Sequence, residues 1–197
     1  MKATPSNVTM RNFLESNNSR LPPLRQCGHL KGSLDKPITL ITYGDYQCPS
    51  SAQANATAND IYQRYHDQLC LIYRHCPRTP PSTSAWKAAE AAEAASDQGK
   101  FWEMHNILYQ HFQALEDGNL VEYADQLDLD IPQFLNRLAN HTYAQNIRED
   151  LESGMANGVA QTPTFFIHIR CHQAQKLASL MHNILEITLS PNRSSNT

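Results

Sequence analysis

A cysteine that could act chemically lies where the chain passes from a predicted strand into a predicted helix. The apolar run Pro37–Tyr43 is followed by Cys48-Pro49-Ser50-Ser51, where a helix-forming segment starts. Unpaired backbone N–H groups at a helix N-terminus stabilise a thiolate over a thiol, so Cys48 is a candidate nucleophile. The spacing has the outline of a Cys-x-x-Cys redox pair, but Ser51 holds the fourth position. Asp45 could act as an acid or base, although an acidic residue closing a strand more often accepts hydrogen bonds from turn N–H groups.

The other cysteines offer Cys48 no obvious partner. Five cysteines scattered over 197 residues are an odd number and do not indicate a framework of structural disulfides, so reduced thiols are expected. Cys76 follows the next predicted strand, on the same edge of a parallel sheet, and its preferred role is packing. Cys70 is interpreted as a small buried apolar residue. Cys27 belongs to a polar N-terminal arm, and Cys171 follows the last predicted strand.

The elements that must position Cys48 form a predicted βαβ unit. Ile38–Tyr43 and Leu69–His75 are short, nearly continuous apolar runs, which is typical of strands buried on both faces. A helix from Cys48 towards His66 lies between them, and Pro49 is tolerated in its first turn because that N–H needs no partner. Such a unit brings its two strands parallel. Thr164–Ile169 predicts a third strand.

A helical insertion is predicted over 84–158. One buried stripe with helical spacing consists of Phe101, Met104, Leu108, Phe112 and Leu115. The alanine-rich run Ala85–Ala95, with Glu90 and Glu93 one turn apart, is interpreted as a solvent-exposed helix face and not as a binding motif.

Capping residues divide the rest of the insertion. Asn119 and Asp130 predict the N-caps of two helices. A further stripe reaches Met155 and ends at Gly158, where a left-handed C-cap suits glycine. A final amphipathic helix is predicted around Leu177–Leu185.

Composition indicates one globular domain with this insertion. The expected boundaries are a polar arm over 1–28, a domain over 29–189 and a disordered tail over 190–197. The net charge of -3 and the pI near 6.3 argue against nucleic acid as a partner. No run approaches the ~20 apolar residues of a membrane span, and the N-terminus lacks a secretory apolar region. A cytoplasmic protein without membrane contact is therefore expected.

Four segments resemble the DsbA-like branch of the thioredoxin superfamily. They are Tyr43-Gly44-Asp45-Tyr46-Gln47-Cys48-Pro49, Tyr73-Arg74-His75, the stretch Ala88–His105 and the stretch Gly158–Ile167. The resemblance covers roughly residues 29–169. It implies an α/β thioredoxin-like fold with an inserted helical subdomain.

The resemblance also implies a thiol-disulfide oxidoreductase with Cys48 as its nucleophile. The family's cis-proline matches Pro163, and the Thr162-Pro163 loop would offer backbone groups to an extended substrate chain. Pro49 and Tyr46 would line the same groove, with Tyr46 as its wall. The implied partners are protein or peptide thiols and disulfides, without a bound cofactor.

Ser51 changes the chemistry that the resemblance implies. In a dithiol enzyme the second cysteine resolves the mixed disulfide, which a serine hydroxyl cannot do. One interpretation is monothiol exchange, in which an external thiol such as glutathione releases Cys48 and Ser51 donates a hydrogen bond to its thiolate. A second is a redox-inactive module that binds peptides. A third, weaker interpretation is a kappa-type glutathione-dependent transferase or isomerase, with Ser50 or Ser51 as the active hydroxyl.

The segment after Ile167 departs from the family pattern. It reads His168-Ile169-Arg170-Cys171-His172 where the family has a hairpin turn and an edge strand, so a shortened fourth strand and an exposed sheet edge are expected. These residues, with Cys27 and His29, include potential metal ligands. Their spacing matches no common zinc pattern, so no metal site is predicted.

Overall fold

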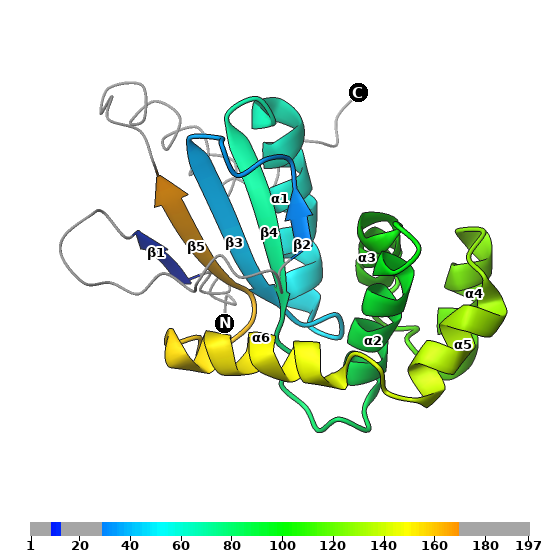
Figure 1. Cartoon of the computed structure of the whole chain (residues 1–197). Helices are drawn as coiled ribbons and strands as arrows, with labels where there is room; N and C mark the ends of the chain where they lie inside the picture. The colour runs from blue at the N-terminus through cyan, green and yellow to red at the C-terminus, as the bar shows by residue number, and fades with distance from the viewer. Residues whose placement is uncertain (1–8, 13–28, 170–197) are drawn as a thin grey trace, which may run out of the picture.

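The fold is a mixed sheet flanked by helices, with a helical group beyond one end (Figure 1). The computed structural model describes residues 9–12 and 29–169, and for 9–12 it describes the backbone alone. The strands are β1 (Thr9–Asn12), β2 (His29–Lys31), β3 (Ile38–Gly44), β4 (Leu69–His75) and β5 (Thr164–Ile169). They lie in the order β1-β5-β3-β4-β2.

The central strands follow the predicted βαβ unit. β3 and β4 are parallel, and their register runs from Ile38 opposite Leu69 to Gly44 opposite His75. β5 is antiparallel to β3, and β2 is antiparallel to β4. Parallel pairing brings the carboxyl ends of β3 and β4 to the same edge, where Cys48 follows β3.

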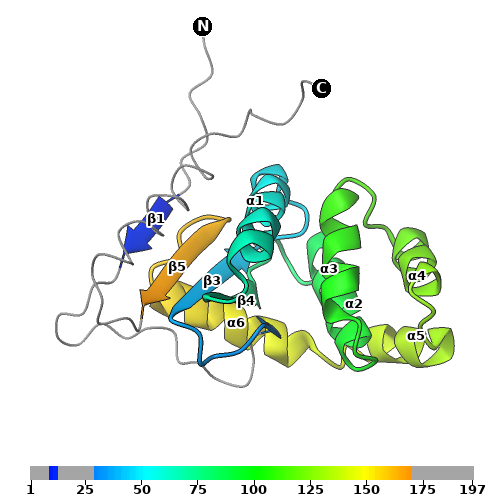
Figure 2. The same ribbon diagram turned by 90° about the horizontal axis from the view of Figure 1, so that it is seen from above.

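Two helices cover opposite faces of this sheet (Figure 2). Alternate residues of β3 point to the two sides because side chains alternate along a strand. Ile38 and Leu40 pack with residues of α1 (Pro49–Tyr65), whereas Ile41 and Tyr43 pack on the side of α6 (Ala144–Ala156). Burial on both faces explains the near-continuous apolar character of β3.

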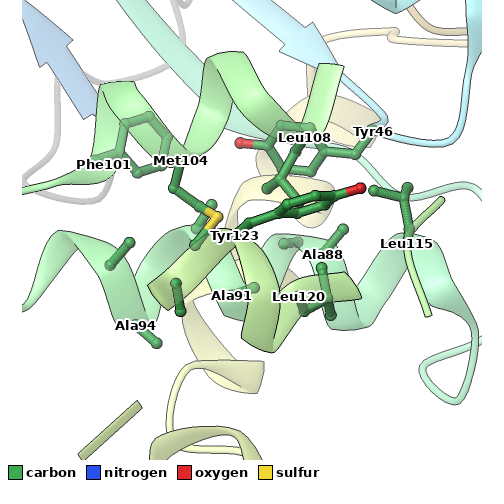
Figure 3. Packing of buried hydrophobic residues seen from close by; sticks show 14 of the residues in the cluster. Tyr46, Ala88, Ala91, Ala94, Phe101, Met104, Leu108, Leu115, Leu120 and Tyr123 are labelled. Atoms are coloured by element: carbon green, nitrogen blue, oxygen red, sulfur yellow. The ribbon is translucent and has the colours of Figure 1, made fainter. Parts of the chain in front are cut away.

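The alanine-rich helix α2 (Ser84–Ser96) lies at the centre of the helical group. It contacts α3 (Phe101–Gln110), α4 (Asp117–Gln126), α5 (Ile131–Ala139) and α6. Figure 3 shows its alanines facing Met104, Leu108 and Tyr123. The prediction of a solvent-exposed face was therefore wrong: Glu90 and Glu93 are 3% and 6% exposed, and the small alanine side chains let neighbouring helices approach closely.

The predicted caps of the later helices are correct in part. Asp130 is the N-cap of α5, and its carboxylate accepts a hydrogen bond from the N–H of Gln133 at 2.9 Å. Helix α4 begins earlier than predicted, with Glu116 rather than Asn119 at its N-cap. Gly158 follows α6 with a φ of +77°, as a left-handed cap requires. Met155 is 65% exposed and does not belong to the buried stripe.

The ends of the chain differ from expectation where they are described. β1 lies within the predicted polar arm and pairs in parallel with β5, so β5 has a neighbour on the edge that was expected to be exposed. The predicted helix at 177–185 and the tail lie outside the described residues, and the domain boundaries stay a prediction. In the part of the chain that is described, no helix has the length and apolar character that crossing a membrane requires.

Candidate functional site

Cys48 lies where three parts of the fold meet. It is the N-cap of α1, with extended backbone angles of φ −89° and ψ 117°, and its side chain is half-buried. Its thiol donates a hydrogen bond to the carbonyl oxygen of Thr162, with 3.5 Å between Sγ and O. The Thr162–Pro163 peptide bond is cis. The structure thus brings together Cys48 and the loop before β5, although 114 residues separate them.

Ser51 lies beneath Cys48 in the first turn of α1. Its side chain is 2% exposed, and its Oγ accepts a hydrogen bond from the N–H of Asp45 at 3.4 Å. Ser51 also lines a small cavity of about 20 Å³ together with Asn55, Tyr73 and Tyr109. The hydrogen bonds of the described residues do not include one between Ser51 Oγ and Cys48 Sγ. Ser51 therefore stabilises the loop through Asp45, and its hydrogen bond to a Cys48 thiolate stays a prediction.

Asp45 stabilises the loop between β3 and α1. One carboxylate oxygen accepts a hydrogen bond from the N–H of Gln47 at 2.9 Å, and the other accepts one from the N–H of Arg78 at 3.0 Å. The side chain is 6% exposed. Because both oxygens bind backbone donors, the predicted turn role is confirmed.

Tyr46 differs from its predicted role as a groove wall. Its side chain is 1% exposed, and its hydroxyl lies 2.9 Å from Nδ1 of His105. The other ring nitrogen of His105, Nε2, lies 2.9 Å from the side-chain oxygen of Asn55 and donates to it, so Tyr46 donates to Nδ1. Burial lowers the pKa of His105 well below its ordinary value, which agrees with a neutral ring. Tyr46 is part of the core under the loop.

A pair of buried tyrosines completes this core. The hydroxyls of Tyr73 and Tyr109 lie 2.9 Å apart, and burial raises the pKa of both. A Cβ atom on Gly44 would overlap the Tyr109 hydroxyl and lie 2.8 Å from Tyr73 Cε2. The sequence patterns did not predict this network. The one available signal was the placement of His105 and Tyr109 four residues apart on an otherwise apolar helix face.

The other described cysteines are buried. Cys76 is 1% exposed, and burial raises the pKa of its thiol to about 11. Cys70 is fully buried, and its thiol donates to Thr39 Oγ1 at 3.4 Å. The predicted packing roles are confirmed, and Cys48 is the one described cysteine within reach of solvent. Cys27 and Cys171 lie outside the described residues.

The metal ligands suggested by the sequence do not come together in the described residues. Cys27, Cys171 and His172 fall outside them, and His168 lies on β5. Another group forms instead: His29, His75 and Glu93 bring three potential ligand atoms within 4.8 Å of one another.

Comparison with known proteins places this geometry in a family. A family model described as Thioredoxin matches residues 26–186. The chain belongs to the thioredoxin family. A thioredoxin-like oxidoreductase from Silicibacter pomeroyi superimposes with a TM-score of 0.67 and 20% identity, over 82% of this chain and 94% of that one. Wolbachia pipientis alpha-DsbA1 superimposes with a TM-score of 0.66 and 19% identity, over 86% of this chain and 94% of that one. The fold of this thioredoxin-family chain is DsbA-like.

Sequence relatives of this family member include parts of larger proteins. Over 144 residues, or 73% of its length, the chain is 40% identical to a protein named Na(+)/H(+) antiporter NhaA 1 from Salinispora arenicola. A namesake from Mycobacterium sp. strain KMS is 32% identical over 160 residues. The matched regions are 22% and 26% of those proteins' lengths. The chain thus spans about a quarter of these relatives.

Proposed function

We propose that this chain is a thiol-disulfide oxidoreductase that acts through Cys48 alone. The observation that carries the proposal is the placement of the Cys48 thiol at the N-terminus of α1, half-buried and 3.5 Å from the Thr162 carbonyl. The first-turn N–H groups of a helix favour a negative charge at this end. Ser51, three residues later in the same turn, is buried and carries no thiol.

The proposed cycle has two exchange steps. The Cys48 thiolate attacks the disulfide between a substrate protein and glutathione, forming a bond between Cys48 and the glutathione sulfur. The substrate leaves as a thiolate and takes a proton from solvent. A second glutathione thiolate then attacks this new bond, which releases the Cys48 thiolate and gives oxidised glutathione. Glutathione is the reductant, and no bound cofactor is required.

The Thr162 carbonyl links substrate binding to the state of the thiol. The Cys48 thiol donates a hydrogen bond to this oxygen, with 3.5 Å between Sγ and O. An extended substrate strand would offer backbone N–H groups to the same carbonyl, as in β-augmentation. The substrate would then take over the acceptor, and the thiol would lose this hydrogen-bond partner. Pro49, exposed in the first turn of α1, would lie beside this strand.

Internal resolution by another described cysteine is unfavourable. Cys76 is 1% exposed, and its raised pKa leaves little thiolate at neutral pH. Cys70 is fully buried between strands. These features support an external thiol as the resolving reagent. Such a reagent belongs to a reducing compartment, so a cytoplasmic location is part of the proposal.

The experiment is turnover of a glutathionylated peptide by glutathione, followed by mass spectrometry. Wild type should remove glutathione from the peptide, and Cys48→Ala should have no activity above the uncatalysed rate. Cys76→Ala serves as the matched control, because it removes a buried thiol and should retain turnover. Turnover by Cys48→Ala, or loss in Cys76→Ala with the fold intact, would refute the proposal.

A redox-inactive peptide-binding module is the second candidate. The lack of a resolving cysteine at position 51 favours it, because the other cysteines of the described residues are buried. In this case wild type and Cys48→Ala would bind an extended peptide equally and neither would turn over. Ser51 is a poor candidate for the active hydroxyl of the kappa-type alternative, because it is 2% exposed and a bound glutathione thiol could not reach it.

A further inference from the structure

Two histidines from separate strands converge on one carboxylate oxygen of a third element. Glu93 on α2 presents Oε1, which lies 2.8 Å from Nε2 of His29 on β2 and 3.0 Å from Nε2 of His75 at the end of β4. His75 is 1% exposed and Glu93 is 6% exposed, whereas the His29 side chain is 14% exposed. The group is thus buried, with its accessible side at the edge strand β2.

We propose that His29, His75 and Glu93 bind a divalent transition-metal ion of the zinc type. Two imidazole nitrogens and one carboxylate oxygen are a donor set that zinc uses, and the fourth position of such a site is taken by water. Imidazole ligands favour zinc and neighbouring transition metals over calcium or magnesium. The site is separate from the Cys48 chemistry and does not depend on it.

The spacing of the three ligand atoms is close to what zinc requires. Bond lengths near 2.0–2.1 Å in a tetrahedron place neighbouring ligand atoms about 3.3 Å apart. The two observed separations from Glu93 Oε1 are 2.8 and 3.0 Å. Lengthening these two separations by about 0.3–0.5 Å, and bringing the two Nε2 atoms, which lie within 4.8 Å of each other, to a similar separation, would convert the hydrogen-bonded group into a ligand set.

Metal binding requires a change of tautomer in both histidines. Their Nε2 atoms lie 2.8 and 3.0 Å from Glu93 Oε1. A metal takes the Nε2 lone pair of each ring, so the ring proton moves to Nδ1. His75 Nδ1 has no hydrogen-bond partner in the described structure, so the change breaks no hydrogen bond at that atom, and the new buried N–H would need water or a protein acceptor.

Aromatic neighbours hold both rings in place. Phe101 stacks on His29, with 3.3 Å between ring centroids, and Tyr73 packs edge-on against His75 at 5.3 Å. Rigid placement of ligands reduces the ordering that binding requires. Because β2, β4 and α2 each supply one ligand, a bound ion would tie the sheet to the helical group.

The first experiment is titration of the full, tag-free chain with Co²⁺, followed by absorption spectroscopy. Binding at this group should give visible bands of a tetrahedral nitrogen and oxygen site, without the near-ultraviolet band of cobalt thiolates. Addition of Zn²⁺ should abolish the visible bands by displacement. A thiolate band that accompanies binding, or the lack of visible bands, would overturn the proposal.

Matched variants locate the site. Glu93→Gln and His29→Gln should each weaken Zn²⁺ binding at least tenfold by calorimetry. Glu90→Gln is the control, because Glu90 lies on the same helix and pairs with a single histidine, His141, at 3.1 Å. Equal loss in Glu90→Gln, or no loss in either ligand variant, would refute the assignment.

Stability gives an independent readout. At Zn²⁺ concentrations about 100 times Kd, the Tm of wild type should rise by about 5–10 °C. The Glu93→Gln variant should show no such rise, and the Glu90→Gln variant should respond as wild type does. A rise of the same size in Glu93→Gln would show that Zn²⁺ binds elsewhere.

Discussion

Replacing Ser51 with cysteine should convert the one-thiol site into a dithiol. Ser51 lies three residues after Cys48 in the first turn of α1, at the position where a Cys-x-x-Cys protein carries its second sulfur. The wild-type chain cannot form a disulfide there. On oxidation the Ser51→Cys variant should therefore form one new disulfide, between residues 48 and 51.

The magnitude follows from two opposing effects. Closing a loop of four residues stabilises the oxidised form by about 1.9 kcal/mol through chain entropy. The helix N-terminus stabilises the reduced form by about 0.3–1 kcal/mol when Cys48 is ionised. The net difference is about 1–1.6 kcal/mol in favour of the oxidised form, or roughly 2–6 °C in Tm. Loss of the hydroxyl that accepts from Asp45 should lower both forms by about 0.5–1.5 kcal/mol relative to wild type.

Mass spectrometry after thiol labelling measures the first part of this prediction. The oxidised variant should have two labelled sites fewer than its reduced form, and peptide mapping should identify residues 48 and 51. Thermal unfolding with and without reductant measures the second part. The double variant Cys48→Ala with Ser51→Cys should show neither the new disulfide nor the dependence of Tm on reductant.

Two results would contradict the reasoning. If no disulfide between residues 48 and 51 forms in excess oxidised glutathione, the two side chains do not face each other as the fold requires. If the reduced variant is the more stable form, the helix N-terminus stabilises the Cys48 thiolate by more than loop closure stabilises the disulfide.

Four further substitutions probe the fold around and beyond the site. His105 stays neutral in the fold, whereas the same side chain in the unfolded chain takes up a proton near pH 6.5. The free energy of unfolding should therefore fall as the pH drops below about 6.5, by up to about 1.4 kcal/mol per pH unit for this group. His105→Gln should reduce the pH dependence of stability measured by urea denaturation between pH 7 and 5, and an unchanged dependence would contradict this. Gly44→Ala should lower Tm by about 2–12 °C because the new methyl group overlaps the Tyr109 hydroxyl. Gly118 lies on a helix with open space around it, so Gly118→Ala should raise the free energy of unfolding by about 0.5–1 kcal/mol. Equal Tm values in the two variants would rule out overpacking at Gly44. Asp130→Ala should cost about 0.5–2 kcal/mol in chemical denaturation through loss of its cap bond, and a neutral effect would show that the cap is dispensable.

Local patterns in the sequence predicted the elements around Cys48. β3, α1 and β4 each have a run of residues whose spacing and flanking residues determine their type. Asp130 was recognisable as a cap because its partner is three residues away. The position of Cys48 at the start of α1 depended on the same local information.

The burial of polar side chains could not be predicted in this way. Glu93 and Tyr46 are buried because partners far along the chain accept or donate hydrogen bonds: His29 lies 64 residues from Glu93, and His105 lies 59 residues from Tyr46. From the sequence, Glu93 was expected on a solvent-exposed helix face and Tyr46 at the wall of a groove, since charged and hydroxyl groups are costly to bury without partners. The tertiary fold supplies those partners.

The depth of Ser51 has a kinetic consequence for any bond that Cys48 forms. An internal resolving thiol acts at a fixed effective concentration, so the lifetime of its adduct is independent of the surroundings. In the proposed mechanism Ser51 is buried and carries no thiol, so release of a Cys48 adduct by an external thiol would be second order. A tenfold fall in external thiol would lengthen that lifetime tenfold. On this reasoning the occupancy of Cys48 would follow the thiol supply of its compartment.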